Sequence, residues 1–175
     1  AGYQRWATIE NLKRAAATMN FLTEHGIDSY EELVERCDAI AAASIRTRES
    51  LRDTEQQITD LSILGKQIDT YRKLKPVYDR YKASKDKEKF LRGFESEIIL
   101  FEAAAREIKK VGLTKLPSAE KLKVELDGLS AHKTALQAEL RKIQREEKKY
   151  HTLRKNVVML LTSKPKSEIS RGLEL

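Results

Sequence analysis

The sequence predicts an all-α fold: a long antiparallel coiled-coil hairpin with a small helical cap and an N-terminal helix. Of the 175 residues, 35% are charged and 6% are aromatic, and the chain has only 7 Gly and 3 Pro. This composition is typical of long helices, and it excludes collagen, low-complexity linkers and most β-sandwiches, which need frequent turn residues. In addition, two long stretches carry seam residues at alternating spacings of four and three, as paired helices do.

Residues 1–28 are expected to form the N-terminal helix and a turn. Seam residues recur every three or four positions from Tyr3 to Glu24, which is the helical period. Gly26, after His25, is the expected helix stop, because glycine adopts the left-handed conformation without a steric cost. The recurring positions are Trp6, Ile9, Leu12 or Lys13, Ala16, Met19 and Leu22.

Residues 29–70 are predicted to be the ascending helix of the hairpin. Ser29 can accept a hydrogen bond from the amide of Glu32, whose carboxylate can reach back to the amide of Ser29, as in a capping box. Pro76 is expected to kink this helix near Arg72, because proline lacks a backbone donor and crowds the carbonyl one turn earlier. The seam positions are Leu33, Cys37, Ile40, Ser44, Thr47, Leu51, Thr54, Ile58, Leu61, Gly65 and Ile68.

Residues 71–120 are predicted to be a basic helical cap, and residues 121–162 the descending helix. The cap is expected to hold a shorter helix from Lys87 to Lys110, ended by Gly112, and Ser118 is the expected N-cap of the last helix. The seam of the descending helix is Leu122, Leu126, Leu129, Lys133, Leu136, Leu140, Ile143, Glu147, Tyr150, Arg154, Val157 and Leu161.

Antiparallel pairing of the two long helices buries both seams, with Leu33 expected near Leu161 and Ile68 near Leu126. The alternative is a three-helix up-down-up bundle, which requires the third helix to match its neighbours in length. The polar residues 163–175 are expected to form a flexible tail.

No catalytic or metal-binding arrangement is visible in the sequence. The histidines His25, His132 and His151 are far apart, with no His-x-His or His-x-x-x-His pair. The single cysteine, Cys37, excludes a disulfide framework and a Cys-based zinc site, and its seam position favours a small buried side chain over a nucleophile. We therefore expect no enzymatic activity in this chain, no metal and no other cofactor.

No apolar run approaches the ~18 residues that span a bilayer, and the basic start lacks the apolar region of a signal peptide. We expect a soluble, cytoplasmic chain with no membrane insertion. Because it begins with Ala1 and not with methionine, we also expect it to be a piece of a longer protein.

Positive charge is concentrated in one stretch. The net charge of +7 favours nucleic acid or another anionic partner. From Tyr71 to Arg92, nine basic residues against three acidic ones give +6. A second basic stretch, residues 141–155, is expected to match the acidic residues of 28–60 within the hairpin.

The basic cap is the candidate DNA interface. Basic side chains can neutralise phosphates, and exposed tyrosines can stack on bases. An alternative is that Tyr71, Tyr78 and Phe90 are the core of the cap. The candidate nucleic-acid-binding residues are Arg72, Lys73, Lys75, Arg80, Lys82, Lys85, Lys87, Lys89, Arg92, Tyr78 and Tyr81.

Several segments resemble one known family. The segments NFLTEHGI (20–27) and SYEEL (29–33) resemble the region after the catalytic domain in relaxase/mobilization nucleases of conjugative and mobilizable elements. Further matches to this region are WA-x-I-x-NLK at 6–13, Tyr71-Arg72-Lys73, Tyr78, Tyr81-Lys82, Phe90 and Leu116-Pro117-Ser118.

The resemblance implies a role beside a DNA-nicking enzyme. Such enzymes nick one strand at an origin of transfer, through a tyrosine and a histidine-bound metal in an N-terminal domain. The histidine cluster is missing here, so the resemblance implies a non-catalytic C-terminal module that assists binding of transfer-origin DNA or contacts relaxosome or secretion-channel proteins. The alternative is a coiled-coil spacer or docking module that binds a protein partner and not DNA.

Overall fold

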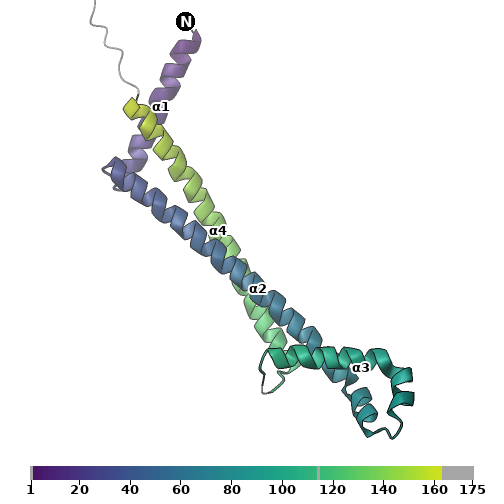
Figure 1. The fold of residues 1–175 in the computed structure, drawn as a ribbon. Coiled ribbons are helices and arrows are strands. Elements are labelled where there is room, and N and C mark those ends of the chain that lie inside the picture. The colour runs from purple at the N-terminus through teal and green to yellow at the C-terminus, as the bar shows by residue number, and fades with distance from the viewer. Residues whose placement is uncertain (1, 114, 163–175) are drawn as a thin grey trace, which may run out of the picture. The chain divides into compact units, whose positions relative to one another are not determined.

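The computed structural model describes residues 2–113 and 115–162, which form four helices and no strand (Figure 1). The helices are α1 (Gly2–Glu24), α2 (Tyr30–Ala83), α3 (Lys87–Lys110) and α4 (Ala119–Thr162). The all-α prediction is confirmed, with 90% of the described residues helical. With 24 residues, α3 is far shorter than α2 with 54 and α4 with 44, as the hairpin requires. The predicted tail, residues 163–175, lies outside the described residues.

Helices end where local signals predict. Gly26 and Gly112 adopt φ of 60° and 72°, the left-handed conformation that glycine favours at a helix end. Ser29 Oγ accepts from the Glu32 amide at 3.1 Å, whereas Glu32 Oε2 accepts from the amide of Asp28 at 2.7 Å. The reciprocal bond of the capping box therefore goes to the residue before the one predicted. Ser118 Oγ accepts from the amide of Lys121 at 3.2 Å, as expected of an N-cap.

The proline in α2 does not end that helix, which continues through Pro76 to Ala83. Backbone dihedrals instead leave the helical region inside α3, at Phe94 (φ −137°, ψ 25°). Gly93 precedes this residue, and glycine weakens a helix interior because it loses more backbone entropy on folding. The kink predicted near Arg72 stays a prediction, while the interruption at Phe94 was not anticipated.

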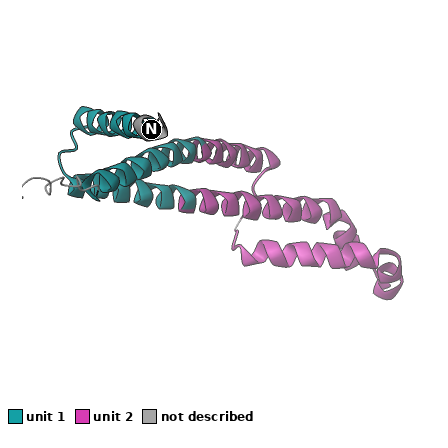
Figure 2. Ribbon diagram, turned by 90° about the horizontal axis from the view of Figure 1, so that it is seen from above, with its two compact units in different colours: residues 1–48, 138–175 teal, residues 49–137 magenta. Residues whose placement is uncertain are grey.

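The chain divides into two compact units (Figure 2): unit 1, residues 1–48 and 138–175, and unit 2, residues 49–137. In each unit a part of α2 packs antiparallel to a part of α4, and every predicted seam position of α2 is buried or half-buried. Each unit also has its own buried apolar cluster.

The cluster of unit 1 corrects the predicted pairing. Leu33 packs with Ile27 and Leu153, and not with Leu161, which is 69% exposed. Leu153 also takes the buried position that the seam assigned to the exposed Arg154. Leu153 packs against Ile27, at the turn between α1 and α2, as well as against Leu33, so a residue outside the strict heptad is buried here.

The cluster of unit 2 shows the same kind of shift. Ile68 packs with Leu122 and with Ile108 of α3, whereas the predicted partner was Leu126. The observed partners therefore lie four residues earlier in α4 than predicted here, and eight residues earlier in unit 1. Because seam positions recur every three or four residues, the seam pattern alone does not fix which α4 residue meets a given α2 residue.

In α1 most of the recurring apolar residues lie on the exposed face, whereas Leu22 is half-buried against the apolar cluster of unit 1. Ile9, Leu12 and Met19 are 54%, 71% and 56% exposed. The opposite face contains the buried Thr18, whose hydroxyl accepts a hydrogen bond from Asn156 of α4 at 3.1 Å. This helix therefore packs in unit 1 through a partly polar face and leaves its apolar stripe uncovered.

Candidate nucleic-acid interface

The candidate site lies in unit 2, where the end of α2 packs on α3 through aromatic rings. Phe101 is buried and stacks with Tyr71 at 4.8 Å and with Tyr78 at 4.2 Å between ring centroids. Phe90 stacks with Phe94 at 4.7 Å. Since these rings pack against one another, they are the core of the cap. We call the six rings of this region the cap aromatic cluster: Tyr71, Tyr78, Tyr81, Phe90, Phe94 and Phe101.

Tyr81 connects the two stacked groups without stacking on either. Its ring lies 6.0 Å from Tyr78 and 6.2 Å from Phe90, tilted by 49° and 42°. It is half-buried. Of the two tyrosines predicted to contact DNA, Tyr78 is therefore part of a stack, and Tyr81 is held at the margin of the cluster.

Two of the predicted basic residues lie over rings of this cluster. Arg80 Cζ is 5.8 Å from the centroid of Phe94, and Lys82 Nζ is 5.4 Å from that of Tyr78. A cation over an aromatic face is attracted to the negative charge density of the ring. These contacts hold both side chains against the cap surface.

Three more predicted residues have polar partners inside unit 2. Arg72 Nη2 donates to the carbonyl of Pro117 at 2.6 Å, which ties α2 to the start of α4. Lys75 Nζ lies 2.9 Å from Asp79, and the hydrogen bond and charge of this carboxylate raise the pKa of Lys75 above its ordinary value. Arg92 lies 3.9 Å from Glu88.

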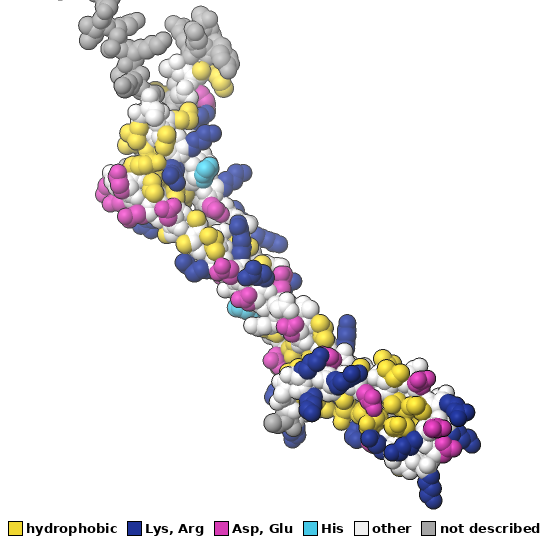
Figure 3. Space-filling model, in the orientation of Figure 1, with side chains coloured by type: hydrophobic (Ala, Val, Ile, Leu, Met, Phe, Trp, Pro, Cys, Tyr) yellow, Lys and Arg dark blue, Asp and Glu magenta, His cyan; other side chains and the backbone are white. Residues whose placement is uncertain are grey.

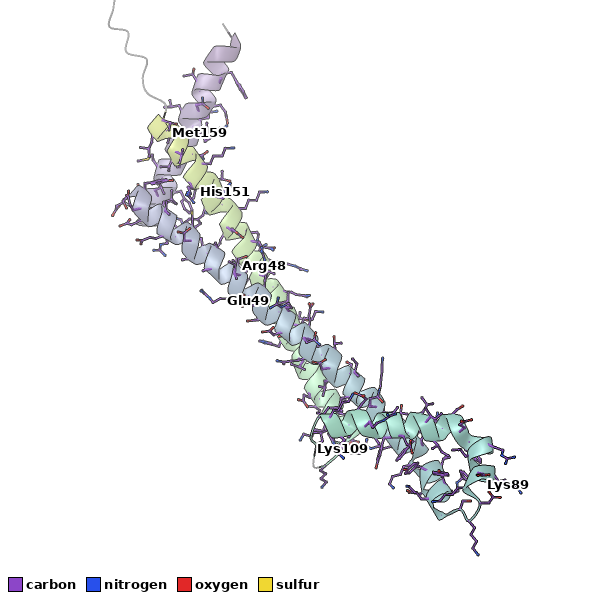
Figure 4. All side chains as sticks on the ribbon, viewed as in Figure 1. Arg48, Glu49, Lys89, Lys109, His151 and Met159 are labelled. Carbon is purple, nitrogen blue, oxygen red and sulfur yellow. The ribbon has the colours of Figure 1, made fainter. Side chains whose placement is uncertain are left out.

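The other four predicted basic residues, Lys73, Lys85, Lys87 and Lys89, are exposed and form no ion pair within residues 2–113 and 115–162. We call Lys85, Lys87 and Lys89 the tip lysines, because they flank the turn from α2 to α3. The nearby Asp86 carboxylate accepts from the amide of Lys89 at 3.0 Å as the N-cap of α3. Figure 3 shows basic side chains around the cap, and Figure 4 places Lys89 in the first turn of α3.

The second basic stretch, residues 141–155, does not pair with acidic residues as expected. In the described part of the chain the one ion pair between α2 and α4 is Glu55–Lys133 at 2.9 Å, which lies outside this stretch. Instead, Lys149 lies over the ring of Phe21 at 4.1 Å in unit 1.

Arg154, in the same stretch, approaches Tyr30 Oη at 3.4 Å, and this contact raises the pKa of the guanidinium. Aromatic side chains, and not carboxylates, therefore hold two of these cations.

His25 and Cys37, whose side chains could take part in catalysis or metal binding, instead contact neighbouring residues of the fold. His25 Nδ1 lies 2.9 Å from the carbonyl of Phe21, and the two rings stack at 3.8 Å. The half-buried Cys37 has its Sγ 3.8 Å from the carbonyl of Tyr150, and burial raises the pKa of the thiol. Among the described residues, no group of three or more His, Cys, Asp or Glu is placed to hold a metal ion.

None of the helices in residues 2–113 and 115–162 combines the length and apolarity that crossing a membrane requires. The ring contacts of Phe94 and Phe101 were not among the predicted site features, although the apolar period of α3 already marked both residues as facing a neighbour.

Comparisons with protein-family models, with curated proteins and with solved structures give no match to this chain.

Proposed function

We propose that this chain is a non-catalytic DNA-binding module of a cytoplasmic relaxase. It would assist binding of transfer-origin DNA, or relaxosome assembly, during mobilization of a plasmid or transposon. The relaxase part of the proposal rests on the resemblance of the sequence segments, and the observation that carries DNA binding is the group of tip lysines. Lys85, Lys87 and Lys89 are exposed around one turn, and within the described chain none has an acidic partner.

The phosphates of DNA can supply the negative charge that these lysines lack within the chain. DNA carries one negative charge per roughly 1.7 Å of duplex, and each phosphate contact releases condensed counterions. Lys73, on α2, is a fourth exposed lysine that forms no ion pair with the described residues. Three predicted residues have uncharged partners and add to the positive potential of the cap, namely Arg72, Arg80 and Lys82. The charges of Lys75 and Arg92 are offset by their carboxylate partners.

The proposal is tested with the triple variant Lys85→Gln, Lys87→Gln, Lys89→Gln. DNA affinity of the parent should fall steeply with salt, and three lost phosphate contacts should flatten the slope of log affinity against log salt by about 2 to 3. Fluorescence anisotropy with a labelled oligonucleotide measures both slopes.

The matched control removes three exposed lysines of α4 in unit 1, through Lys142→Gln, Lys148→Gln and Lys155→Gln. Because the net charge changes equally, this control separates a local site from a general charge effect. An equal loss of slope in both variants would indicate a general charge effect and would contradict a local DNA site in the cap. A parent chain that does not bind DNA at ~50 mM salt would contradict DNA binding altogether.

The exposed apolar stripe of α1 favours a second candidate function, docking to a relaxosome or secretion-channel protein. Ile9, Leu12 and Met19 lie on the face opposite the one that contacts α4, and large apolar side chains aligned on one helix face are typical of interaction sites. Leu12→Gln with Met19→Gln should then weaken binding to purified proteins of this kind, while the tip-lysine variant binds them normally.

A further inference from the structure

We infer that the cap binds the phosphate backbone of DNA without stacking on bases, so that duplex DNA is its preferred form. The inference rests on the proposed DNA-binding function and deepens it by naming the kind of DNA. It follows from two observations. Ring faces in the cap aromatic cluster are covered by other side chains, and the candidate cations that have no partner are lysines.

Stacking on a base requires a ring face that a base can reach. Phe101 is nearly parallel to Tyr71 and to Tyr78, with interplanar angles of 24° and 23°. Two rings that are both stacked on a third occupy its opposite faces, so Phe101 has no free face. Phe101 also covers one face of Tyr71 and one of Tyr78.

Other ring surfaces are covered in a similar way. Lys82 lies over Tyr78 and Arg80 over Phe94, whose ring also stacks with Phe90. A base that stacked on Tyr78 or Phe94 would have to displace a cation or separate two rings. Half-buried Tyr81 differs from the other five rings of the cluster, because its contacts with Tyr78 and Phe90 are tilted and not stacked. Tyr81 is therefore the ring of the cluster that is most open to a stacked base, and it is the ring to test.

The basic side chains without a partner favour contacts to the DNA backbone over contacts to the bases. Among the candidate residues, those without a partner are all lysines, Lys73 and the tip lysines, whereas the candidate arginines Arg72, Arg80 and Arg92 are held by Pro117, Phe94 and Glu88. Lysine acts as a compact point charge, whereas bidentate contacts to guanine come mainly from arginine. Contacts to phosphates position a protein but carry no sequence information. Since a duplex has the higher charge density, it should bind at least as tightly as a single strand of the same length.

The test compares a 20-base-pair duplex, its separate strands, and the homopolymers dT20 and dA20 at ~50 to 200 mM salt, using the full chain. We expect the duplex to bind best, and the single strands to differ by less than about threefold. Tyr81→Leu should change the affinity for dT20 by less than about twofold. Loss of a stacking contact would instead weaken binding roughly 5- to 150-fold.

Tyr81→Phe is the matched control, because it keeps the ring, and circular dichroism checks that both variants keep their helix content. A single-strand preference of tenfold or more would overturn the inference whichever ring is responsible. A loss in Tyr81→Leu that Tyr81→Phe does not share would overturn it at that ring. Both outcomes would leave DNA binding itself intact, whereas failure of the parent to bind any of these DNAs would overturn the proposed function and the inference with it.

Discussion

Replacing Phe101 with alanine should be among the most destabilising single changes in unit 2. The side chain is buried, only 6% exposed, and it joins α3 to α2 by stacking with Tyr71 and Tyr78. Truncating a buried phenylalanine removes its transfer free energy and leaves a cavity, which costs about 3–5 kcal/mol in the free energy of unfolding. Urea denaturation followed by circular dichroism measures this loss.

Two further variants separate the contributions to this loss. Phe101→Leu keeps an apolar side chain but removes two aromatic pairs of about 0.5–1.5 kcal/mol each, so it should destabilise by roughly 1–3 kcal/mol. Ile99→Ala, two residues away in α3, truncates a side chain that is 55% exposed and should change stability by no more than about 0.5 kcal/mol. A cost for Phe101→Ala that equals the cost for Ile99→Ala would refute the assignment of the rings as the core of the cap.

Two predictions concern unit 1. Leu153→Ala should destabilise by about 2–5 kcal/mol, because it truncates a buried side chain, whereas Leu161→Ala should be nearly neutral; thermal melts that rank the two the other way would restore the register expected from the seam. Burial raises the pKa of Cys37 above its ordinary 9.0, so alkylation at pH 8 should be slower in the folded chain than in urea. Because folding favours the neutral thiol, the stability that Cys37 contributes should be present below pH 9 and should decrease as the pH rises above it. Cys37→Ala should abolish that part of the pH dependence, and an unchanged profile would contradict it.

The helices and most of their ends could be predicted because their signals are local. Gly26 and Gly112 end helices through their own backbone freedom, and Ser118 caps α4 with a side chain three residues from its donor. The buried face of α2 also follows from its own spacing. Such features depend on residues within one or two turns of each other, so no knowledge of a distant partner is needed.

The register of the hairpin, the packed face of α1 and the free cations of the cap were decided only by tertiary structure. A heptad seam repeats itself, so spacing alone does not fix which α4 residue meets Leu33. The observed partner, Leu153, is not a seam residue and packs also against Ile27, at the turn between α1 and α2. Likewise, Arg72 is held by a carbonyl 45 residues away, while the tip lysines have no such partner. Charge and composition are read from single residues, but whether a cation or a ring face is available to a ligand depends on which other helix lies beside it.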